Sequence, residues 1–139
     1  VEGLDYPISL KGIVDRVDRF NGVTRIIDYK TGKVVQNQLE IHDWDLLTTD
    51  ERFSKAFQIL MYAYMMHQEG LITEASIGGI ISFKNLSNWV LKFSTKASPR
   101  ATKKDVLLTK DVFLTFEEQL KALILEIYNL DIPFMEKEL

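Results

Sequence analysis

Residues 12–32 read GIVDRVDRFNGVTRIIDYKTG, and this segment predicts a tight β-hairpin. The dipeptide Asn21-Gly22 is the strongest short hairpin signal that a sequence offers. Counting outward from a loop made of these two residues places Asp15 directly opposite Asp28. Side chains alternate between the faces of a strand, so Lys30 shares the face of both acids.

Two acidic side chains in opposed positions repel each other. Their Cβ atoms lie about 4.5–5.5 Å apart, and at an effective dielectric constant of about 20 two charges at this distance repel by roughly 3 kcal/mol. Ordinary cross-strand contacts contribute about 0.2–1 kcal/mol per pair and do not offset this repulsion. A cation between the carboxylates, or a proton on one of them, would offset the repulsion.

The composition indicates one folded domain. The chain has 139 residues, of which 46% are hydrophobic and 27% charged, which is enough apolar material for a core and excludes a disordered tail. No segment approaches the roughly 20 apolar residues of a membrane span, and the amino terminus lacks a signal-peptide pattern. We therefore expect a cytoplasmic protein with no membrane partner.

Charge and cysteine content restrict the chemistry. The formal net charge of −3 is unusual for a stand-alone nucleic-acid binder, so local basic clusters or another domain would have to hold a nucleic acid. The chain has no cysteine, so disulfides and thiolate metal sites are excluded. Any metal would be held by oxygen or imidazole ligands, which favours Mg²⁺ or Mn²⁺.

The remaining pattern predicts alternating strands and helices. The first hairpin carries apolar residues on both faces, so we expect its sheet to be covered on both sides. Residues 33–52 predict a loop with short structured pieces, and residues 54–69 a helix that ends at Gly70. A second hairpin is expected over residues 75–94, with its loop at 85–88. A final helix would begin at Thr109, or at Thr115 with a capping box to Glu118, and end at Asp131-Ile132-Pro133. The fold class is α/β, with a mixed sheet flanked by helices in the order strand, strand, helix, strand, strand, helix.

Several polar or aromatic residues have a structural and a functional interpretation. Asp18 and Arg16 point away from the acidic pair, and a structural ion pair is the better interpretation for them. A basic loop containing Lys96, Arg100, Lys103 and Lys104 would either contact DNA phosphates or be solvated. For His42, His67, Trp44 and the methionines at 61, 65 and 66, packing or surface roles are favoured over chemical ones.

The segments GIVDRVD (12–18), IIDYKTG (26–32) and QILMY (58–62) together resemble the RecB-type branch of the PD-(D/E)XK nuclease superfamily. The closest likeness is to the nuclease domains of AddAB/RecBCD-type helicase–nucleases, with Cas4-like exonucleases as near relatives. The resemblance covers residues from about 10 to 134. It implies a restriction-endonuclease-like core, hydrolysis of DNA phosphodiesters, and a role in processing double-strand ends for recombinational repair, with a helicase region or subunit as partner.

The resemblance also implies a role for each motif residue. Asp15, Asp28 and the backbone carbonyl of Tyr29 would bind Mg²⁺ or Mn²⁺. Lys30 would position the attacking water or help to deprotonate it. Gln58 and Tyr62, four residues apart on one helical face, would support the site near the lysine or the DNA. Thr31 and Gly32 would shape the turn that leaves the active-site strand.

Two features of such relatives have no counterpart in the sequence. Relatives usually supply a further histidine or glutamate ligand from a helix upstream of the first strand, and Glu2 is a poor substitute. We therefore expect one nuclease domain, residues 1–139, taken from a larger protein and weakly active or inactive by itself. Many relatives also carry a cysteine-bound iron–sulfur cluster after a segment like Ile132-Pro133-Phe134, and for the parent protein this stays open. The rival interpretations are a stand-alone Cas4-like exonuclease and a catalytically silent module that guides DNA or holds a subunit.

Overall fold

The computed structural model describes residues 14–72, 75–84 and 90–129, and its centre is a mixed β-sheet. The strands run in the order β1-β2-β4-β5, and β7 also pairs with β4. Strands β2 and β4 are parallel, whereas β1 on β2 and both β5 and β7 on β4 are antiparallel. The strand bounds are β1 Arg16–Phe20, β2 Val23–Lys30, β4 Ser76–Ser82, β5 Leu91–Lys92 and β7 Leu107–Leu108. Two further short strands, β3 (Glu40–Ile41) and β6 (Ser94–Thr95), pair in parallel beside this sheet.

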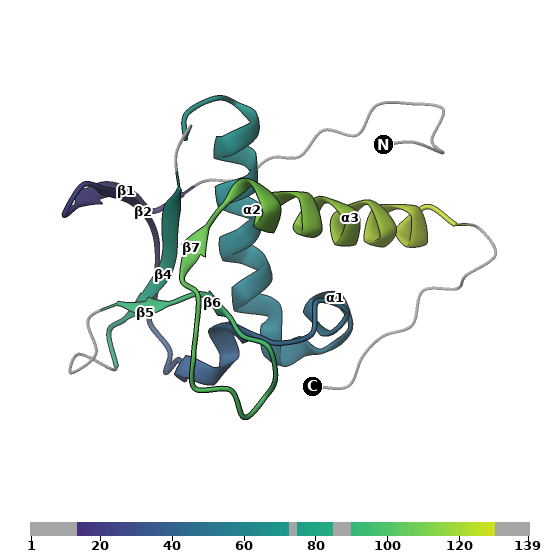
Figure 1. The fold of residues 1–139 in the computed structure, drawn as a ribbon, viewed down its shortest axis with the longest axis horizontal. Coiled ribbons are helices and arrows are strands. Elements are labelled where there is room, and N and C mark those ends of the chain that lie inside the picture. Colours follow the sequence, from purple (N-terminus) through teal and green to yellow (C-terminus); the bar gives the residue numbers. More distant parts are fainter. Residues whose placement is uncertain (1–13, 73–74, 85–89, 130–139) are drawn as a thin grey trace.

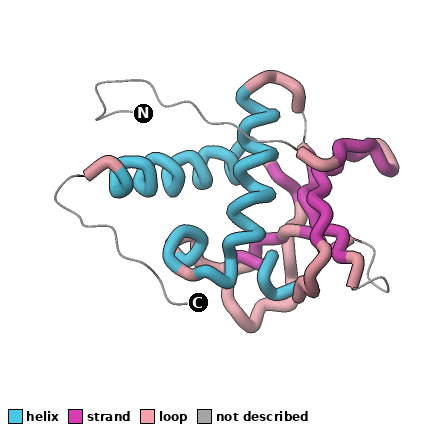
Figure 2. Tube along the Cα trace, turned by 180° about the vertical axis from the view of Figure 1, so that it is seen from behind, coloured by secondary structure: helices cyan, strands magenta, loops and turns pink. Residues whose placement is uncertain are grey.

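Helices cover one side of the sheet (Figure 1). Helix α2 (Ser54–Gln68) lies in the connection between β2 and β4 and runs alongside these strands, as Figure 2 shows from behind. Helix α3 (Lys110–Ile127) follows β7 and extends away from the sheet. Residues 33–53 contribute short pieces, as expected from their irregular sequence. These are η1 (Gln36–Leu39), α1 (Leu46–Thr49) and η2 (Glu51–Phe53). The α/β class with a mixed sheet flanked by helices is therefore confirmed.

The first hairpin has the predicted register. Arg16 pairs with Ile27 and Phe20 with Val23, so the loop consists of Asn21 and Gly22 alone. Both loop residues have positive φ angles, 52° and 79°, as a type I′ turn requires.

Burial on both faces of this hairpin was expected, and this is true of β2 only. Ile26 and Ile27 point to opposite faces of β2, and both are buried. Val17 on β1 is 45% exposed, which contradicts the expectation for that strand. The reason is position: β1 is at the edge of the described sheet and pairs with β2 alone.

The predicted end of α2 is confirmed. Gly70 has a φ of 74°, and the amide of Leu71 donates to the carbonyl of Met66 over 3.0 Å, which is the hydrogen bond of a Schellman motif. The second hairpin is also present as β4 and β5, with Ile80 opposite Leu91. Its expected loop at 85–88 lies outside the described residues.

The last helix begins at the earlier of its two predicted positions. Thr109 is the N-cap, and its hydroxyl accepts a hydrogen bond from the amide of Val112. Thr115 lies inside the helix, where its hydroxyl donates to the carbonyl of Asp111, so the capping box from Thr115 to Glu118 is wrong. The apolar face that anchors the helix already begins at Phe113, before the residues that suggested the box. The helix ends at Ile127, with Tyr128 as its C-cap, so the predicted continuation up to Asp131-Ile132-Pro133 is wrong, although those three residues themselves lie outside the described part of the chain.

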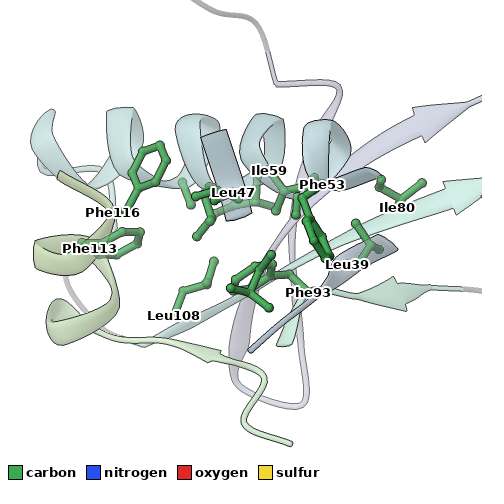
Figure 3. Close-up of a cluster of buried hydrophobic side chains, with 14 of the residues drawn as sticks. Leu39, Leu47, Phe53, Ile59, Ile80, Phe93, Leu108, Phe113 and Phe116 are labelled. Atoms are coloured by element: carbon green, nitrogen blue, oxygen red, sulfur yellow. The ribbon is translucent and has the colours of Figure 1, made fainter. Parts of the chain in front are cut away.

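The core lies between α2 and the sheet and continues under α3 (Figure 3). Ile59 of α2 lies against Gly78 of β4, which has no side chain at this position. Phe116 of α3 packs edge-on against Phe57 and Tyr64 of α2. This packing fixes α2 on the sheet face that carries Ile26, which is also the face of Asp28 and Lys30.

We expect Gly78→Ala to destabilise the protein by about 1–3 kcal/mol, the usual cost of overpacking a core. A Cβ atom at position 78 would lie 2.4 Å from Cγ2 of Ile59, and this branched side chain has little rotamer freedom in a helix. Chemical denaturation measures the free energy of unfolding. Gly32→Ala is the matched control, because a Cβ atom there meets nothing within 4 Å. Equal stabilities of the two variants would mean that the contact between α2 and β4 is looser than described.

Candidate active site

Two carboxylates meet at the open end of the first hairpin. Asp15 directly precedes β1, whose first pair is Arg16 with Ile27, and its carboxylate interacts with that of Asp28 on β2. Asp15 is exposed at the sheet edge, and its Oδ2 accepts a hydrogen bond from the backbone amide of Tyr29 over 2.9 Å. Asp28 is only 4% exposed, because α2 covers its face of the sheet. The hairpin therefore presents one exposed and one buried acid to the same region.

Three polar side chains continue from the buried acid toward α2. The Nζ atom of Lys30 lies 2.9 Å from Oδ2 of Asp28 and donates a hydrogen bond to Oε1 of Gln58 over 2.6 Å. Nε2 of Gln58 in turn donates to the hydroxyl of Tyr62 over 2.8 Å. The structure thus connects all five side chains that the sequence singled out, although 47 residues separate the first from the last.

The order of these contacts fixes the orientation of the Gln58 amide. Lys30 has only donors, so it requires the amide oxygen, and the amide nitrogen is left to face Tyr62. The hydroxyl of Tyr62 accepts this bond, which leaves its own proton for another acceptor. The end of the chain of contacts is therefore a hydrogen-bond donor.

The electrostatics of the two acids differ. Burial raises the pKa of Asp28, and the neighbouring Asp15 carboxylate raises it further, although the Lys30 ammonium opposes both. The backbone amide of Tyr29, together with contacts to Asp28 and Lys30, lowers the pKa of Asp15. The two acids behave as a coupled pair in which Asp15 carries the charge more readily.

The donor set fits a hard divalent cation. Oδ2 of Asp28 is buried and accepts no hydrogen bond, since its contact with Lys30 is an ion pair without hydrogen-bond geometry. A buried carboxylate oxygen beside a second carboxylate offers the ligands that Mg²⁺ prefers, which are one or two carboxylates with the remaining positions left to water and phosphate. Within the described residues no group of three or more His, Cys, Asp or Glu side chains could hold a metal ion. The described part of the chain thus supplies two carboxylates and main-chain oxygens.

Ser82 supports the site and was missed in the sequence. It pairs with Lys30 in the β2–β4 register, and its buried hydroxyl donates to the carbonyl of Gly32 over 2.6 Å. The amide of Phe83 donates to the carbonyl of Lys30 over 3.0 Å. Both bonds tie the backbone around Lys30 to β4. The sequence carried no signal for this, because the parallel pairing of β2 with β4 depends on the crossover through α2.

The opposite face of the hairpin carries the expected ion pair and one more partner. Arg16 lies 2.9 Å from Asp18, as predicted. Arg25, which the sequence did not single out, makes two hydrogen bonds of 2.7 and 2.8 Å to the same carboxylate. These contacts lower the pKa of Asp18, with the Arg25 hydrogen bond as the largest cause. They hold the hairpin together on the side away from Asp28.

The basic loop divides into paired and exposed residues. Lys96 and Lys104 both form ion pairs with the buried carboxylate of Glu40, and Lys96 does so at 2.9 Å. This local role competes with phosphate binding for those two lysines. Arg100 and Lys103 are exposed. Glu40, which lies in the segment predicted as a loop with short structured pieces, is therefore an anchor between β3 and the loop that follows β6.

We expect Glu40→Gln to lower the free energy of unfolding by about 2 kcal/mol at neutral pH, the scale of a lost hydrogen bond to a charged group. Burial alone would raise the pKa of Glu40, but the hydrogen bonds from Lys104 and Lys96 outweigh it and lower the pKa below its ordinary value of 4.5. A lowered pKa in the folded state means that the stabilisation is complete above 4.5 and is lost as the pH falls through the folded value. Denaturation curves from neutral to acidic pH should show the gap between wild type and variant closing in that window. A gap that is independent of pH would contradict the ion-pair assignment.

Four of the remaining residues of mixed interpretation pack against other side chains: His67, Trp44, Met61 and Met66. The ring of His67 lies 4.7 Å from that of Phe113, between α2 and α3. Trp44 packs against the core and anchors the loop before α1. Met61 and Met66 also pack against the core. His42 lines a hollow of about 200 Å³ between η1, η2 and the loop that follows β6.

The comparisons with known proteins agree with this geometry. A family model described as the PD-(D/E)XK nuclease superfamily matches residues 1–139, and the chain belongs to this superfamily. Its members are generally nucleases with DNA as substrate, and they typically use divalent metal ions such as Mg²⁺. Neither the curated proteins nor the solved structures give a significant match. In the described residues, no helix is both long and apolar enough to cross a lipid bilayer.

Proposed function

We propose that this chain is the nuclease domain of a RecB/AddB-type helicase–nuclease and hydrolyses DNA phosphodiesters with Mg²⁺ or Mn²⁺ during double-strand-end processing. The observation that carries the proposal is the facing pair Asp15 and Asp28 with the Lys30 ammonium 2.9 Å from the buried acid. Two acids and one cation on a single hairpin are costly for stability and useful for holding a metal and a phosphate together. Family membership supports the nuclease activity, and the three-motif resemblance supports the narrower assignment.

Asp15, Asp28 and the carbonyl of Tyr29 would hold the metal. When bound there, a divalent ion would lower the pKa of a coordinated water and stabilise negative charge on the phosphate and the leaving oxygen. The hydrogen bond from the Tyr29 amide to Asp15 orients that carboxylate before any ligand arrives. Burial of Asp28 keeps its side chain in one position.

Lys30 would act on the attacking water. Its ammonium favours hydroxide nearby, and the hydrogen bond to Gln58 limits the positions that the flexible side chain can take. The attacking water would lose one proton to solvent; as its oxygen bonds to phosphorus, the bond to the leaving oxygen would break and that oxygen would gain a proton from solvent. The hydroxyl of Tyr62 is positioned by Gln58 and would donate to a phosphate oxygen of the substrate.

The direct test is cleavage of linear DNA by this chain, single-stranded and double-stranded, with Mg²⁺, with Mn²⁺ and with EDTA. Product formation with either metal and none with EDTA is the expected result. If the chain alone is inactive, the same assay on the longer protein decides the matter. Binding of DNA without cleavage by the longer protein in both metals would favour a silent, DNA-guiding module instead.

The helicase partnership has a separate test in the parent gene. Helicase motifs encoded ahead of this segment would support the end-processing machine. A short reading frame that encodes little else would favour a stand-alone Cas4-like exonuclease. Exposed Arg100 and Lys103 remain candidates for sequence-independent contacts with DNA phosphates in either case.

A further inference from the structure

We propose that the hairpin face opposite the two carboxylates binds unpaired bases of single-stranded DNA by stacking. We call it the stacking face and define it as Arg16, Phe20, Arg25, Tyr29 and Phe83. In the hairpin register Phe20 lies opposite Val23 and Arg16 opposite Ile27, which places the hairpin members on the face away from Asp28. The hairpin tip extends from the body of the molecule (Figure 1), and Phe20 beside it is exposed.

Two aromatic rings are unusually exposed on this face. Phe20 is 57% exposed and Phe83 is 54% exposed. Neither ring is loose: the guanidinium of Arg25 lies 4.7 Å from the Phe20 ring centroid, and Phe83 stacks on Tyr29 with centroids 5.8 Å apart and an angle of 25° between the rings. Held rings with an open surface are the kind of platform on which bases stack.

The charge on this face suits a polyanion. Asp18 is shared by Arg16 and Arg25, so these three side chains leave one positive charge uncompensated. Arginine beside aromatic rings offers both a partner for phosphates and cation–π contacts with bases. An apolar protein partner would use the exposed aromatic rings but not the positive charge of the arginines. Single-stranded DNA would use both, so it is the better match.

The stacking face is continuous with the proposed catalytic site. Tyr29 carries the ring of the Phe83 stack, and its backbone amide binds the Asp15 carboxylate. The amide of Phe83 binds the carbonyl of Lys30. From the Phe20–Val23 pair to Tyr29 the strand covers about 20 Å, which is the length of a few nucleotides. A strand held on this face would reach the active site around the β1 edge, where Asp15 is exposed. The inference therefore rests on the proposed function and adds to it the form of the substrate.

Fluorescence anisotropy with a labelled oligothymidylate and the full chain in EDTA tests the stacking face without any cleavage. We expect the double variant Phe20→Ala/Phe83→Ala to bind about tenfold more weakly than wild type, within the range measured for base stacking. Phe83→Trp keeps a ring at this position and should bind at least as tightly as wild type. The double variant Leu71→Ala/Leu114→Ala removes side chains of similar exposure, 66% and 52%, from other surfaces and should change nothing.

A blunt duplex of the same length separates stacking from phosphate binding. The Phe20→Ala/Phe83→Ala variant should lose much less affinity for the duplex than for the single strand, because the bases of the duplex are already stacked on one another. Unchanged single-strand affinity, equal losses on both substrates, or a wild type that does not bind single strands would each overturn the proposal. None of these results depends on catalysis. If the chain binds through Phe20 and Phe83 but the longer protein cleaves no DNA, the nuclease assignment fails and the stacking face stands.

A second measurement does not depend on affinity. The chain has no cysteine, so Phe83→Cys introduces a unique thiol for a photoactivated cross-linker, and Leu114→Cys provides the control on α3. Cross-links to single-stranded DNA should form from position 83 and not from position 114. Equal yields at both positions would contradict a defined stacking face.

Discussion

Replacing Lys30 by alanine should reduce the rate of metal-dependent DNA cleavage by about 10²–10⁴-fold, the usual contribution of a positioned proton-transfer group. The ammonium is held between Asp28 and Gln58 and has no equivalent in the described hairpin. The variant should remain folded, because Lys30 is not part of the apolar core. Initial rates on linear DNA with Mn²⁺, at matched protein concentrations, measure the loss.

Lys33→Ala is the control for this result. Lys33 is an exposed lysine three residues further along the chain and lies outside the chain of contacts that runs from Asp15 to Tyr62. The Lys33→Ala variant should cleave DNA at the wild-type rate. Circular dichroism should show that both variants are folded. Equal rates for Lys30→Ala and wild type would reject the proposed mechanism while leaving the fold untouched.

Replacing Asp28 by asparagine should have opposite effects on metal binding and on stability. Affinity for Mn²⁺, measured by isothermal titration calorimetry, should fall by at least about 100-fold, because even indirect partners of a metal ligand contribute about 10–100-fold. Without metal the variant should melt at a higher temperature than wild type. The raised pKa of Asp28 shows that burial disfavours its charged form in the folded state, and asparagine carries no charge.

Mn²⁺ affinity and melting temperature, measured together on the Asp28→Asn variant, distinguish a metal ligand from a structural acid. If Asp28 served mainly as the ion-pair partner of Lys30, its removal would lower the melting temperature and leave Mn²⁺ affinity unchanged. Glu118→Gln, which removes an exposed acid from α3, is the control and should alter neither quantity. The shift of the melting temperature on adding Mn²⁺ is a third measurement. A bound ion should stabilise the wild type and should not stabilise the Asp28→Asn variant.

The sequence could predict the features that depend on neighbours along the chain. The turn residues Asn21 and Gly22 defined the register of the first hairpin, and with it the opposition of Asp15 and Asp28. Helical periodicity and Gly70 located α2 to within a residue of its observed bounds. Where two local signals competed, as at Thr109 and Thr115, the buried apolar face of α3 decided between them.

Other features depended on distant partners and carried no local signal. Strand β7 consists of two residues that become a strand only by pairing with β4. For the lysines at 96 and 104 the sequence allowed DNA contact or a solvated loop, and it gave no sign of their ion-pair partner Glu40, which lies 56 and 64 residues away. The exposure of Val17 likewise followed from the position of β1 in the sheet, which the sequence does not state.

By itself, then, the amino-acid sequence determined the acidic pair and its lysine, because a two-residue turn and the alternation of side chains leave a hairpin one register. Only the tertiary structure decided how that pair is surrounded. The crossover through α2 lays Gln58 and Tyr62 on the face of Asp28, buries one acid while leaving the other exposed, and brings Ser82 beside Lys30. These contacts span tens of residues, and they arise from the packing of a helix on a sheet rather than from any local preference of the chain.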